Sequence, residues 1–462
     1  MKNSTSRSIY ISAAHKSSGK TIVSLGLSRI LSNLNQDIQT FKKGPDYIDM
    51  GWLSLASKKS SYNLDFNTQT KKEINNFYDQ KKSTINIIEG NKGLYDGISV
   101  SGIDDNAAMS MLLNAPVILV IDTEGITRGI APLLQGYINF EKKCNIKGVI
   151  LNKVKTERHE NKLINAVKEY TNLEILGSIR KSKDLEISER HLGLIPVNEK
   201  KIANKKIEQI SRIINDSIDQ KKFNKIGINF KKNKLSKKDV KKANFLTNKK
   251  KLKLGVFYDK SFGFYYPDDI ENFEKYGAEI IQINSIKNKK LPKVDALFIG
   301  GGFPETNAPV IKKNKNLMKN VKDFIESGKP CYAECGGLMY LSESINYDNK
   351  KHKMVGVIPG NIIMDKKPVG RGYVKLKINK NHLWGMKNNS SISAHEFHHA
   401  RLLLNKNSKN YAYNITRGFG INGISDGFQY KNLLANFSHL RHTKNCPWIK
   451  YFINFIEESK ND

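Results

Sequence analysis

Two strand-to-helix turns of different chemistry constrain the fold of this chain more than any other feature. The first turn, Ala14–Thr21, follows the apolar run Ile9–Ile11 and has the form of a phosphate-binding loop. In such a loop, backbone N–H groups and the start of the following helix surround phosphate oxygens. The second turn, Pro330–Gly337, places a cysteine between an apolar segment and two glycines. Because each turn connects a buried strand to a helix, the pair predicts two α/β units in one chain.

Apolar runs alternate with helical patterns over residues 1–200, and this alternation predicts a parallel sheet. Several runs are continuously apolar, as strands buried on both faces are. We therefore predict an α/β fold that begins with a P-loop domain, a doubly wound parallel sheet over residues 1–200. Its expected strands are Ser8–Ala13, Ile38–Phe41, Thr84–Glu89, Pro116–Asp122, Ile146–Asn152 and Glu174–Ile179.

A lysine-rich stretch separates this domain from a second set of apolar runs. Residues 201–250 are weakly apolar and end in a basic run, so we predict a helix tail and a solvated interdomain connector there. Residues 251–462 are predicted to form a second α/β domain, richer in strands beyond Val355, where glycines punctuate the chain. Its expected first strands are Leu252–Tyr258, Glu279–Ile283, Ala296–Ile299 and Pro330–Ala333.

Composition excludes several other classes of protein. No run approaches the ~18 apolar residues of a membrane-spanning helix, and the polar start Met1–Ser8 carries no secretory signal, so we expect a cytoplasmic protein. The net charge of +33 comes from lysine used throughout the chain rather than from a basic recognition helix, so no nucleic-acid partner is expected. Four cysteines lack the spacing of a zinc site: Cys144, Cys331, Cys335 and Cys446.

The first turn predicts an ATP site. Lys20 is expected to neutralise the β- and γ-phosphates, and Thr21 to bind Mg²⁺. Ala14 stands where the first glycine of this loop is usual, and a serine-rich turn without a nucleotide is the alternative. The expected ATP-binding residues of the turn are Ser18, Gly19, Lys20 and Thr21.

Acidic residues follow two of the predicted strands. Asp46 and Asp49 lie in a loop shaped by glycine and proline, and Glu89 ends the next strand. Ligands bind at the carboxyl edge of an open α/β sheet, so we expect Thr21, Asp46 (or Asp49) and Glu89 to bind Mg²⁺. Asn152, at the end of another strand, is expected to contact the adenine of ATP.

The second turn predicts a cysteine nucleophile. Cys335 follows an apolar segment, and Gly336 and Gly337 let a helix start at once, where the helix N-terminus favours a thiolate. Cys331, inside the segment, is expected to be a core residue. A thiolate on such a turn, together with an ATP site, predicts an enzyme that frees ammonia at one centre and uses it at the other.

Glutamine hydrolysis by a cysteine also needs backbone donors for an oxyanion and an imidazole that takes the thiol proton. Three consecutive glycines at the end of a predicted strand are expected to supply the donors and shape the glutamine loop: Gly300, Gly301 and Gly302. The residues alone leave three histidines as candidates for the imidazole: His395, His398 and His439.

Several segments resemble the cobyrinic acid a,c-diamide synthase family of cobalamin biosynthesis. The resemblance continues past the connector and covers most of the chain. It implies a dethiobiotin-synthetase-like ATPase domain, followed by a class I glutamine-amidotransferase-like domain over residues 251–462. It also implies ATP and L-glutamine as co-substrates, Mg²⁺ as cofactor, and substrate carboxylates activated as acyl phosphates. The segments that carry it first are Phe41–Met50, Asn63–Asp65, Glu89–Gly97 and Ser188–Pro196.

The resemblance also bears on individual residues. Phe437–Arg441 is similar to the family's Tyr-x-His-x-His segment, which implies His439 as the partner of Cys335, with Arg441 in place of the second histidine. Asn91 and Lys92 replace a Val-Met pair usual in relatives, and Asp105–Ala107 replaces Ser-Thr-Ala. The aromatic segment Asp259–Pro267 also matches, and lines either the macrocycle or the core. The loop beside the metal predicts a substrate pocket of Tyr47, Asp49, Leu94, Tyr95 and Asp96.

The function implied by the resemblance is amidation of the a and c acetate carboxylates of cobyrinate, by a ligase that forms C–N bonds. The expected partner is a corrinoid or related tetrapyrrole carboxylate, without nucleic acid or membrane, and homodimerisation is left open. One alternative is the same chemistry on sirohydrochlorin, Ni-sirohydrochlorin or sirohaem. Another is a ParA-like DNA-associated ATPase, which would need a lysine at the position of His15.

Overall fold

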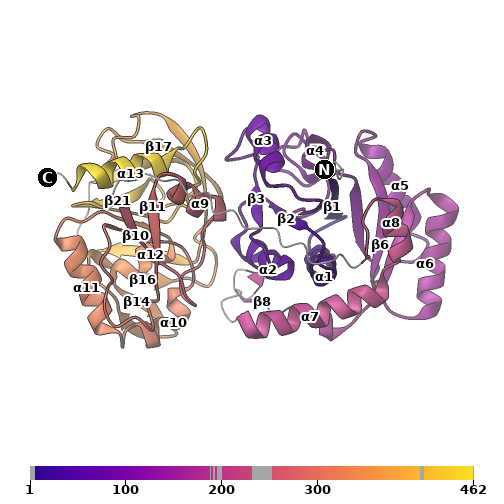
Figure 1. The fold of residues 1–462 in the computed structure, drawn as a ribbon, viewed down its shortest axis with the longest axis horizontal. Coiled ribbons are helices and arrows are strands. Elements are labelled where there is room, and N and C mark those ends of the chain that lie inside the picture. The colour runs from indigo at the N-terminus through magenta and orange to yellow at the C-terminus, as the bar shows by residue number, and fades with distance from the viewer. Residues whose placement is uncertain are drawn as a thin grey trace. The chain divides into compact units, whose positions relative to one another are not determined.

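The chain divides into two compact units, residues 1–243 and 244–462 (Figure 1). The computed structural model describes residues 6–187, 189–190, 193–194, 200–231, 252–405 and 410–460. The segment Ser188–Pro196, which contributes to the family resemblance, therefore lies mostly outside the described residues. In the described part, no helix is long and apolar enough to cross a membrane.

The first unit is built on a seven-stranded sheet with the order β3-β2-β4-β1-β5-β6-β7, in which every neighbouring pair is parallel. The predicted parallel α/β sheet is thus confirmed. The short edge strand β3 was not predicted, because three residues carry no readable periodicity. The strands are β1 (Arg7–Ala13), β2 (Ile38–Lys43), β3 (Tyr62–Leu64), β4 (Ile85–Glu89), β5 (Val117–Asp122), β6 (Ile146–Val154) and β7 (Glu174–Arg180), with a separate pair β8 (Glu189–Arg190) and β9 (Gly193–Leu194).

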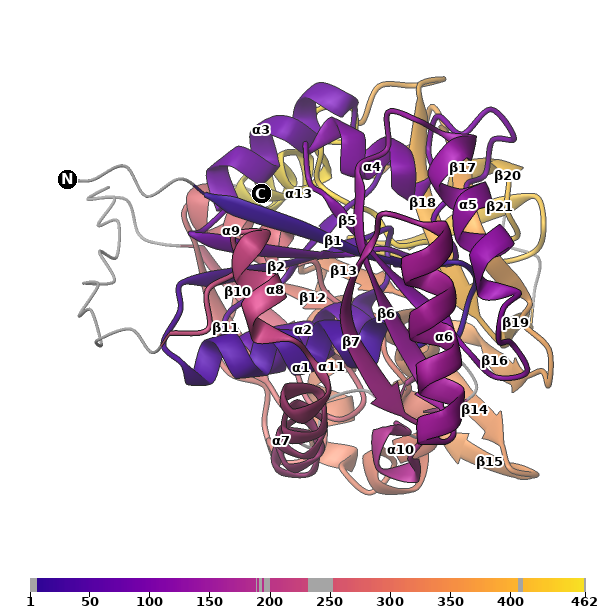
Figure 2. The ribbon, with the colours of Figure 1, turned by 90° about the vertical axis from the view of Figure 1, so that its right-hand side faces the viewer.

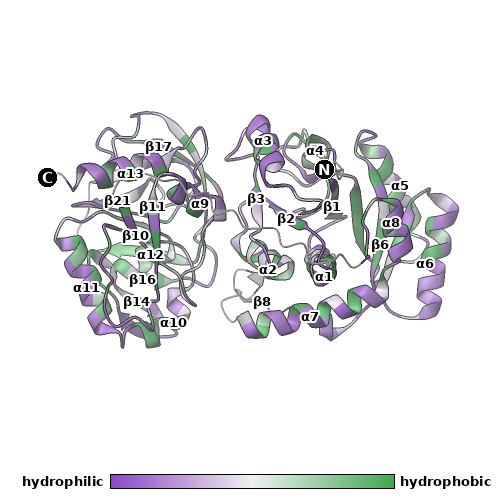
Figure 3. Ribbon diagram, in the orientation of Figure 1, coloured by the Kyte–Doolittle hydropathy of each residue, from purple (hydrophilic) through white to green (hydrophobic). Residues whose placement is uncertain are grey.

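Helices cover both faces of this sheet, because alternate residues of each central strand point to opposite sides. Ile9 and Ile11 of β1 pack with residues of α1 and α7, whereas Tyr10 belongs to a second cluster with residues of α3 to α6. Figure 3 shows the apolar strands in green between helices of mixed colour. The helices are α1 (Lys20–Asn33), α2 (Tyr47–Ser57), α3 (Lys71–Lys81), α4 (Asn106–Leu112), α5 (Ile130–Phe140), α6 (Glu157–Tyr170), the 3₁₀ turn η1 (Lys183–Leu185), α7 (Lys200–Ser217) and α8 (Gln220–Lys225).

Helix α7 belongs to the first unit, although its sequence was assigned to a connector. Ile207, Ile210 and Ile214 are buried, and α7 packs across α1: Figure 1 shows α7 from the side and α1 end-on, and Figure 2 the reverse. A Cβ at Gly26 of α1 would stand 2.4 Å from the side chain of Ile214, so glycine permits the close approach. Lysines on the outer face hid this amphipathic pattern, and residues 232–251 lie outside the described residues.

The second unit contains a nine-stranded sheet with the order β11-β10-β12-β13-β22-β21-β20-β17-β18, and a four-stranded sheet with the order β15-β14-β16-β19. The large sheet is parallel from β11 to β22 and antiparallel from β22 to β18. The predicted α/β class and strand-rich end are confirmed. The strands are β10 (Leu252–Phe257), β11 (Ala278–Ile283), β12 (Ala296–Ile299), β13 (Cys331–Glu334), β14 (Ser342–Tyr347), β15 (Lys350–Lys353), β16 (Ile358–Met364), β17 (Gly370–Ile378), β18 (Ser391–His398), β19 (Ala400–Leu404), β20 (Tyr411–Arg417), β21 (Ser425–Tyr430) and β22 (Leu433–Asn436).

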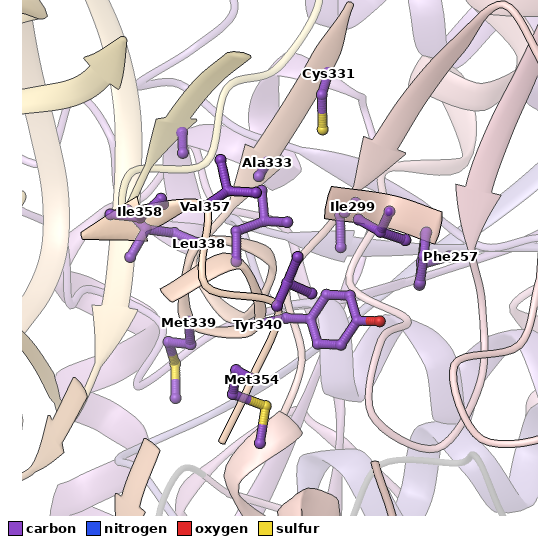
Figure 4. Packing of buried hydrophobic residues seen from close by; sticks show 14 of the residues in the cluster. Phe257, Ile299, Cys331, Ala333, Leu338, Met339, Tyr340, Met354, Val357 and Ile358 are labelled. Carbon is purple, nitrogen blue, oxygen red and sulfur yellow. The ribbon is translucent and has the colours of Figure 1, made fainter. Parts of the chain in front are cut away.

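The core of the second unit lies on both faces of strand β13. Cys331 and Ala333 point into the cluster drawn in Figure 4, with Leu338 and Met339 of α12. Burial raises the pKa of the Cys331 thiol, as expected of a core cysteine. Tyr265 and Tyr266 of the aromatic segment are buried as well, so these two rings are core. The helices are α9 (Pro267–Lys275), α10 (Pro304–Ile311), α11 (Lys315–Glu326), α12 (Gly336–Leu341) and α13 (Trp448–Glu458).

Candidate functional site

The turn after β1 has the backbone of a phosphate-binding loop. Ser17 and Gly19 adopt left-handed conformations, with φ of 66° and 97°, and α1 starts at Lys20. Ala14 is not among the positive-φ residues, so the position where glycine is usual needs no glycine here. The loop therefore retains its shape despite the missing first glycine.

Asn152, at the carboxyl end of β6, supports this loop directly. Its Nδ2 donates to the carbonyl oxygen of Ser18 at 2.8 Å. A Cβ at Gly19 would stand 2.1 Å from the same nitrogen. Gly19 is thus required both by its backbone angles and by the approach of Asn152. The expected contact of Asn152 with adenine stays a prediction.

Glu89, the last residue of β4, lies at the centre of a buried polar cluster beside the loop. Thr21 Oγ1 and Lys42 Nζ each donate to Glu89 Oε1 at 2.7 Å, and Lys42 Nζ also donates to Asp49 Oδ2 at 2.6 Å. Burial raises the pKa of Glu89, while Lys42 opposes that rise. Glu89 Oε2 is buried and has no hydrogen-bond partner in the described part of the chain. Such an oxygen can accept a cation.

Sequence reasoning missed Lys42. The available signal was its position inside a strand that is buried along its whole length, because a buried lysine requires carboxylate partners. The identity of those partners follows from the sheet order, which places β2 next to β4.

Asp46 and Asp49 have different structural positions. Asp46 is the N-cap of α2: its Oδ1 accepts from the backbone N–H groups of Ile48 and Asp49, both at 2.9 Å. Asp49 lies in the first turn of α2 and shares the ammonium of Lys42 with Glu89. The structure thus brings Thr21 and Glu89 together and uses Asp46 as a helix cap. Among the described residues, no three His, Cys, Asp or Glu side chains form a group that could hold a metal alone.

Lys20 is buried at the start of α1. Its burial, together with the charge of Lys42, lowers the pKa of Lys20 to about 8, against the opposing effect of Glu89. Phosphate oxygens placed at the loop would supply the negative charge that this ammonium lacks.

The residues expected to bind substrate build the loop after β4. Leu94 is fully buried, and its N–H donates to the carbonyl of Ala13 at 2.8 Å. Tyr95 stacks on Tyr137 with ring centroids 5.3 Å apart. Asp96 Oδ2 accepts from the N–H of Gly93 at 2.9 Å, and Tyr47 is buried in α2. Leu94 and Tyr47 therefore shape this region from the core, and any direct contact with substrate stays a prediction.

The departure from the family at Asp105–Ala107 has a structural role. Asp105 caps α4 by accepting from the N–H of Ala108 at 2.7 Å, as a serine cap would. Asn106 Oδ1 accepts from the hydroxyl of Tyr10 at 2.8 Å and from the N–H of Asn91 at 3.1 Å. Asn106 thus holds the loop after β4 in place, while Asp105 caps the helix.

Cys335 forms a sharp turn between β13 and α12. Its backbone has φ 47° and ψ −101°, a strained conformation for a residue with a side chain, which costs about 1–3 kcal/mol. A Cβ at Gly337 would stand 2.0 Å from the carbonyl oxygen of Ile299. The glycines after Cys335 therefore let the turn press against the end of β12.

His439 is the histidine that hydrogen-bonds to Cys335. Its Nδ1 lies 3.2 Å from Glu334 Oε2, and both side chains are only 3% exposed. Burial lowers the pKa of His439, but hydrogen bonds and charge from Cys335 and Glu334 outweigh this and raise it to about 10. An imidazole beside the sulfur, with a carboxylate at its other side, is the arrangement of a cysteine nucleophile and its base.

The other two candidate histidines have different surroundings. His395 stacks on His439 with ring centroids 4.9 Å apart, and burial, followed by the charges of His439 and Arg441, lowers its pKa well below the usual value. His398 lies 3.5 Å from a carboxylate oxygen of Glu396.

The three glycines after β12 pack tightly around the cysteine turn. A Cβ at Gly301 would stand 2.4 Å from Cε1 of His439, and one at Gly302 would stand 2.0 Å from the carbonyl oxygen of Ser261. The N–H of Gly300 donates to the Tyr265 hydroxyl at 2.9 Å. The Gly300 amide therefore already has a protein partner, and the assignment of the three glycines to an oxyanion and glutamine loop stays a prediction.

Arg441, in place of the family's second histidine, is buried in an ion pair. Its Nη2 lies 3.1 Å from Asp268 Oδ2, and its guanidinium lies 4.8 Å from the ring centre of Tyr266. The substitution is therefore accommodated by a partner of opposite charge.

Comparison with known proteins agrees with both units. Residues 10–195 match the CobQ/CobB/MinD/ParA nucleotide binding domain, and residues 253–446 match the CobB/CobQ-like glutamine amidotransferase domain. The cobyrinate a,c-diamide synthase of Magnetococcus marinus is 36% identical, over 97% of each chain. The enzymes of that name from Caldanaerobacter subterraneus and Methanobrevibacter smithii are 34% and 38% identical, over 97% and 91% of this chain and 98% and 92% of theirs. Matched over nearly its whole length, and with a phosphate loop and a cysteine turn in the matched domains, the chain belongs to the cobyrinate a,c-diamide synthase family.

Proposed function

We propose that this chain amidates the a and c acetate carboxylates of cobyrinate in cobalamin biosynthesis, with ATP as energy source and glutamine as nitrogen donor. The observation that carries the proposal is the pairing of Cys335 with His439, which also contacts Glu334, in a chain that also has a phosphate loop. The full-length relatives carry the name cobyrinate a,c-diamide synthase, which favours cobyrinate over sirohydrochlorin, Ni-sirohydrochlorin or sirohaem. A ParA-like ATPase would leave the cysteine turn without a role.

The residues beside the loop fit Mg²⁺. Glu89 offers a buried oxygen without a hydrogen-bond partner among the described residues, and Thr21 hydroxyl lies next to it. Thr21, Glu89 and an aspartate of the β2 loop, Asp46 or Asp49, would hold the ion. When bound, Mg²⁺ neutralises charge on the phosphate oxygens.

In the first unit, the chain positions ATP and the substrate carboxylate. The loop amides, the start of α1 and Lys20 bind the phosphates. A substrate carboxylate oxygen attacks the γ-phosphorus and the bond to ADP breaks, which gives an acyl phosphate. Asp49, held by Lys42 at the loop edge, and Asp96 are the polar side chains that we assign to the substrate side.

In the second unit, the Cys335 thiolate attacks the carboxamide carbon of glutamine. His439 gives its proton to the leaving ammonia, and water then hydrolyses the glutamyl thioester to glutamate. The amides of Gly302 and Gly336 would stabilise the oxyanion, since a Cβ at Gly336 would stand 3.0 Å from the Gly302 nitrogen. Ammonia displaces phosphate from the acyl phosphate and forms the amide.

The test is glutamine-dependent phosphate release over a panel of cobyrinate, sirohydrochlorin and sirohaem, with product masses measured in parallel. We expect two successive amidations of cobyrinate, each with one ATP and one glutamine consumed. Preferential amidation of sirohydrochlorin or sirohaem would contradict the assigned substrate. A cytoplasmic location without a nucleic-acid or membrane partner fits this chemistry, and homodimerisation stays a prediction.

A further inference from the structure

Glu334 lies directly before the nucleophile, on the opposite face of β13 from the apolar cluster of Figure 4. Successive side chains of a strand point to opposite faces. Cys331 and Ala333 enter the cluster of Figure 4, so Tyr332 and Glu334 point the other way. Glu334 is 2% exposed. The strand that delivers Cys335 therefore also delivers a buried carboxylate to the side where His439 lies.

Three donors reach the Glu334 carboxylate. Its Oε1 accepts from the Tyr332 hydroxyl at 2.6 Å and from the N–H of Leu440 at 2.9 Å, and Oε2 lies 3.2 Å from His439 Nδ1. Two of these contacts are with residues 439 and 440, so the carboxylate fixes both the ring and the backbone that carries it. A histidine that donates from Nδ1 to a carboxylate has its Nε2 available for the nucleophile.

We propose that Glu334 is the positioning acid of the glutaminase, so that consecutive residues of one turn supply both the acid and the nucleophile of a Cys335–His439–Glu334 triad. This rests on the proposed glutaminase function of the cysteine turn. Arg441, two places after His439, cannot serve as this acid, because it is a cation that is paired with Asp268.

Titratable groups of two strands in the described part of the chain face His439. Cys335 and Glu334 face it from the β13 turn, and His395 stacks on it from β18. His395 is held neutral, since burial and the neighbouring cations lower its pKa. Glu334 is thus the carboxylate that contributes to the raised pKa of His439.

The test is Glu334→Gln, which keeps shape and hydrogen bonding but removes the charge. We expect glutamine-driven kcat/KM to fall about 10²–10⁴-fold, mostly in kcat, as when the orienting acid of a triad is lost. The basic limb of its pH profile should move toward lower pH by about 1–2 pH units, because an anion next to the imidazolium is lost. Ammonia-driven amidation should be unchanged.

A second readout needs no tetrapyrrole, so it separates this proposal from the proposed substrate. Alkylation of Cys335 by iodoacetamide at neutral pH, followed by peptide mass, should slow about tenfold in Glu334→Gln. Glu334→Asp should recover part of the rate. The matched control is Glu396→Gln, which also changes a buried glutamate beside a histidine and should leave the pH profile and the alkylation rate unchanged.

Two results would overturn the proposal. One is a Glu334→Gln enzyme whose glutamine-driven pH profile and Cys335 alkylation rate equal those of the wild type. The other is a parallel fall of ammonia-driven and glutamine-driven amidation, since a purely structural role would lower both. Failure to amidate cobyrinate with either nitrogen source would count against the substrate and not against Glu334, which the alkylation rate tests alone.

Discussion

The two candidate sites each place a buried glutamate at the carboxyl end of a parallel strand, but the hydrogen-bond partners of the two carboxylates differ. Glu334, at the end of β13, contacts Tyr332, Leu440 and His439. Glu89, at the end of β4, uses one oxygen for Thr21 and Lys42, while the other has no hydrogen-bond partner among the described residues. The glutaminase centre is thus complete from protein atoms, whereas the ATP centre has a place for a ligand.

The largest effect should come from replacing the nucleophile, because this change removes glutamine hydrolysis and leaves the ATP centre intact. Cys335→Ser is expected to lower glutamine-driven amidation about 10⁴-fold or more, because the hydroxyl is a far weaker nucleophile next to this imidazole. Ammonia-driven amidation should persist, and product mass with either nitrogen source measures both. Loss of both activities would show that the two centres are not functionally separable.

Removal of the buried ammonium should have the next largest effect, on stability. Lys42→Met leaves Glu89 and Asp49 without their shared cation, and the free energy of unfolding should fall by about 3–5 kcal/mol. Urea unfolding of the free protein measures it. The control is Lys153→Met, which breaks a partly exposed pair with Asp122 and should cost at most about 1 kcal/mol. Equal losses in the two variants would mean that Lys42 is not a buried partner of Glu89.

The role of Glu89, whose Oε2 has no hydrogen-bond partner among the described residues, can be tested by Glu89→Gln. Amidation with ammonia and with glutamine should fall together by about 10²–10³-fold, because a charge that supports phosphoryl transfer is lost. Alkylation of Cys335 should stay at the wild-type rate. Asp46→Asn decides between the two aspartates: asparagine also caps a helix, so an activity that changes little would leave Asp49 as the metal ligand. A large loss in Asp46→Asn would instead place Asp46 on the metal, as first predicted.

The smallest effect should come from Asp105, the N-cap of α4, where the sequence differs from the resembled family outside both centres. Asp105→Ala should lower the free energy of unfolding by about 1 kcal/mol, the usual value of a lost N-cap. Asp105→Ser restores the residue type usual in relatives and should recover most of that loss in the same unfolding measurement. An unchanged stability in Asp105→Ala would remove the capping explanation for this substitution.

Periodicity and turn chemistry predicted both α/β units and the cysteine turn, because parallel strands and nucleophile turns depend on local sequence. The polar partners were harder to predict. Lys42 and Glu334 each lie inside an apolar-looking strand, and their partners depend on which strands become neighbours. Asp46 was expected at the metal because its loop lies at the right edge, yet it is used to cap α2. Helix α7 was assigned to a connector because lysines dominate its first two turns, ahead of the buried isoleucines.

The hydrogen bond from Asn152 to the carbonyl of Ser18 has a consequence for nucleotide recognition. It joins the end of β6, where the base is expected, to the turn that receives the phosphates. A turn held by a side chain of another strand has less conformational entropy to lose when a nucleotide binds. Much of the affinity gained by each phosphate contact is then retained in the complex.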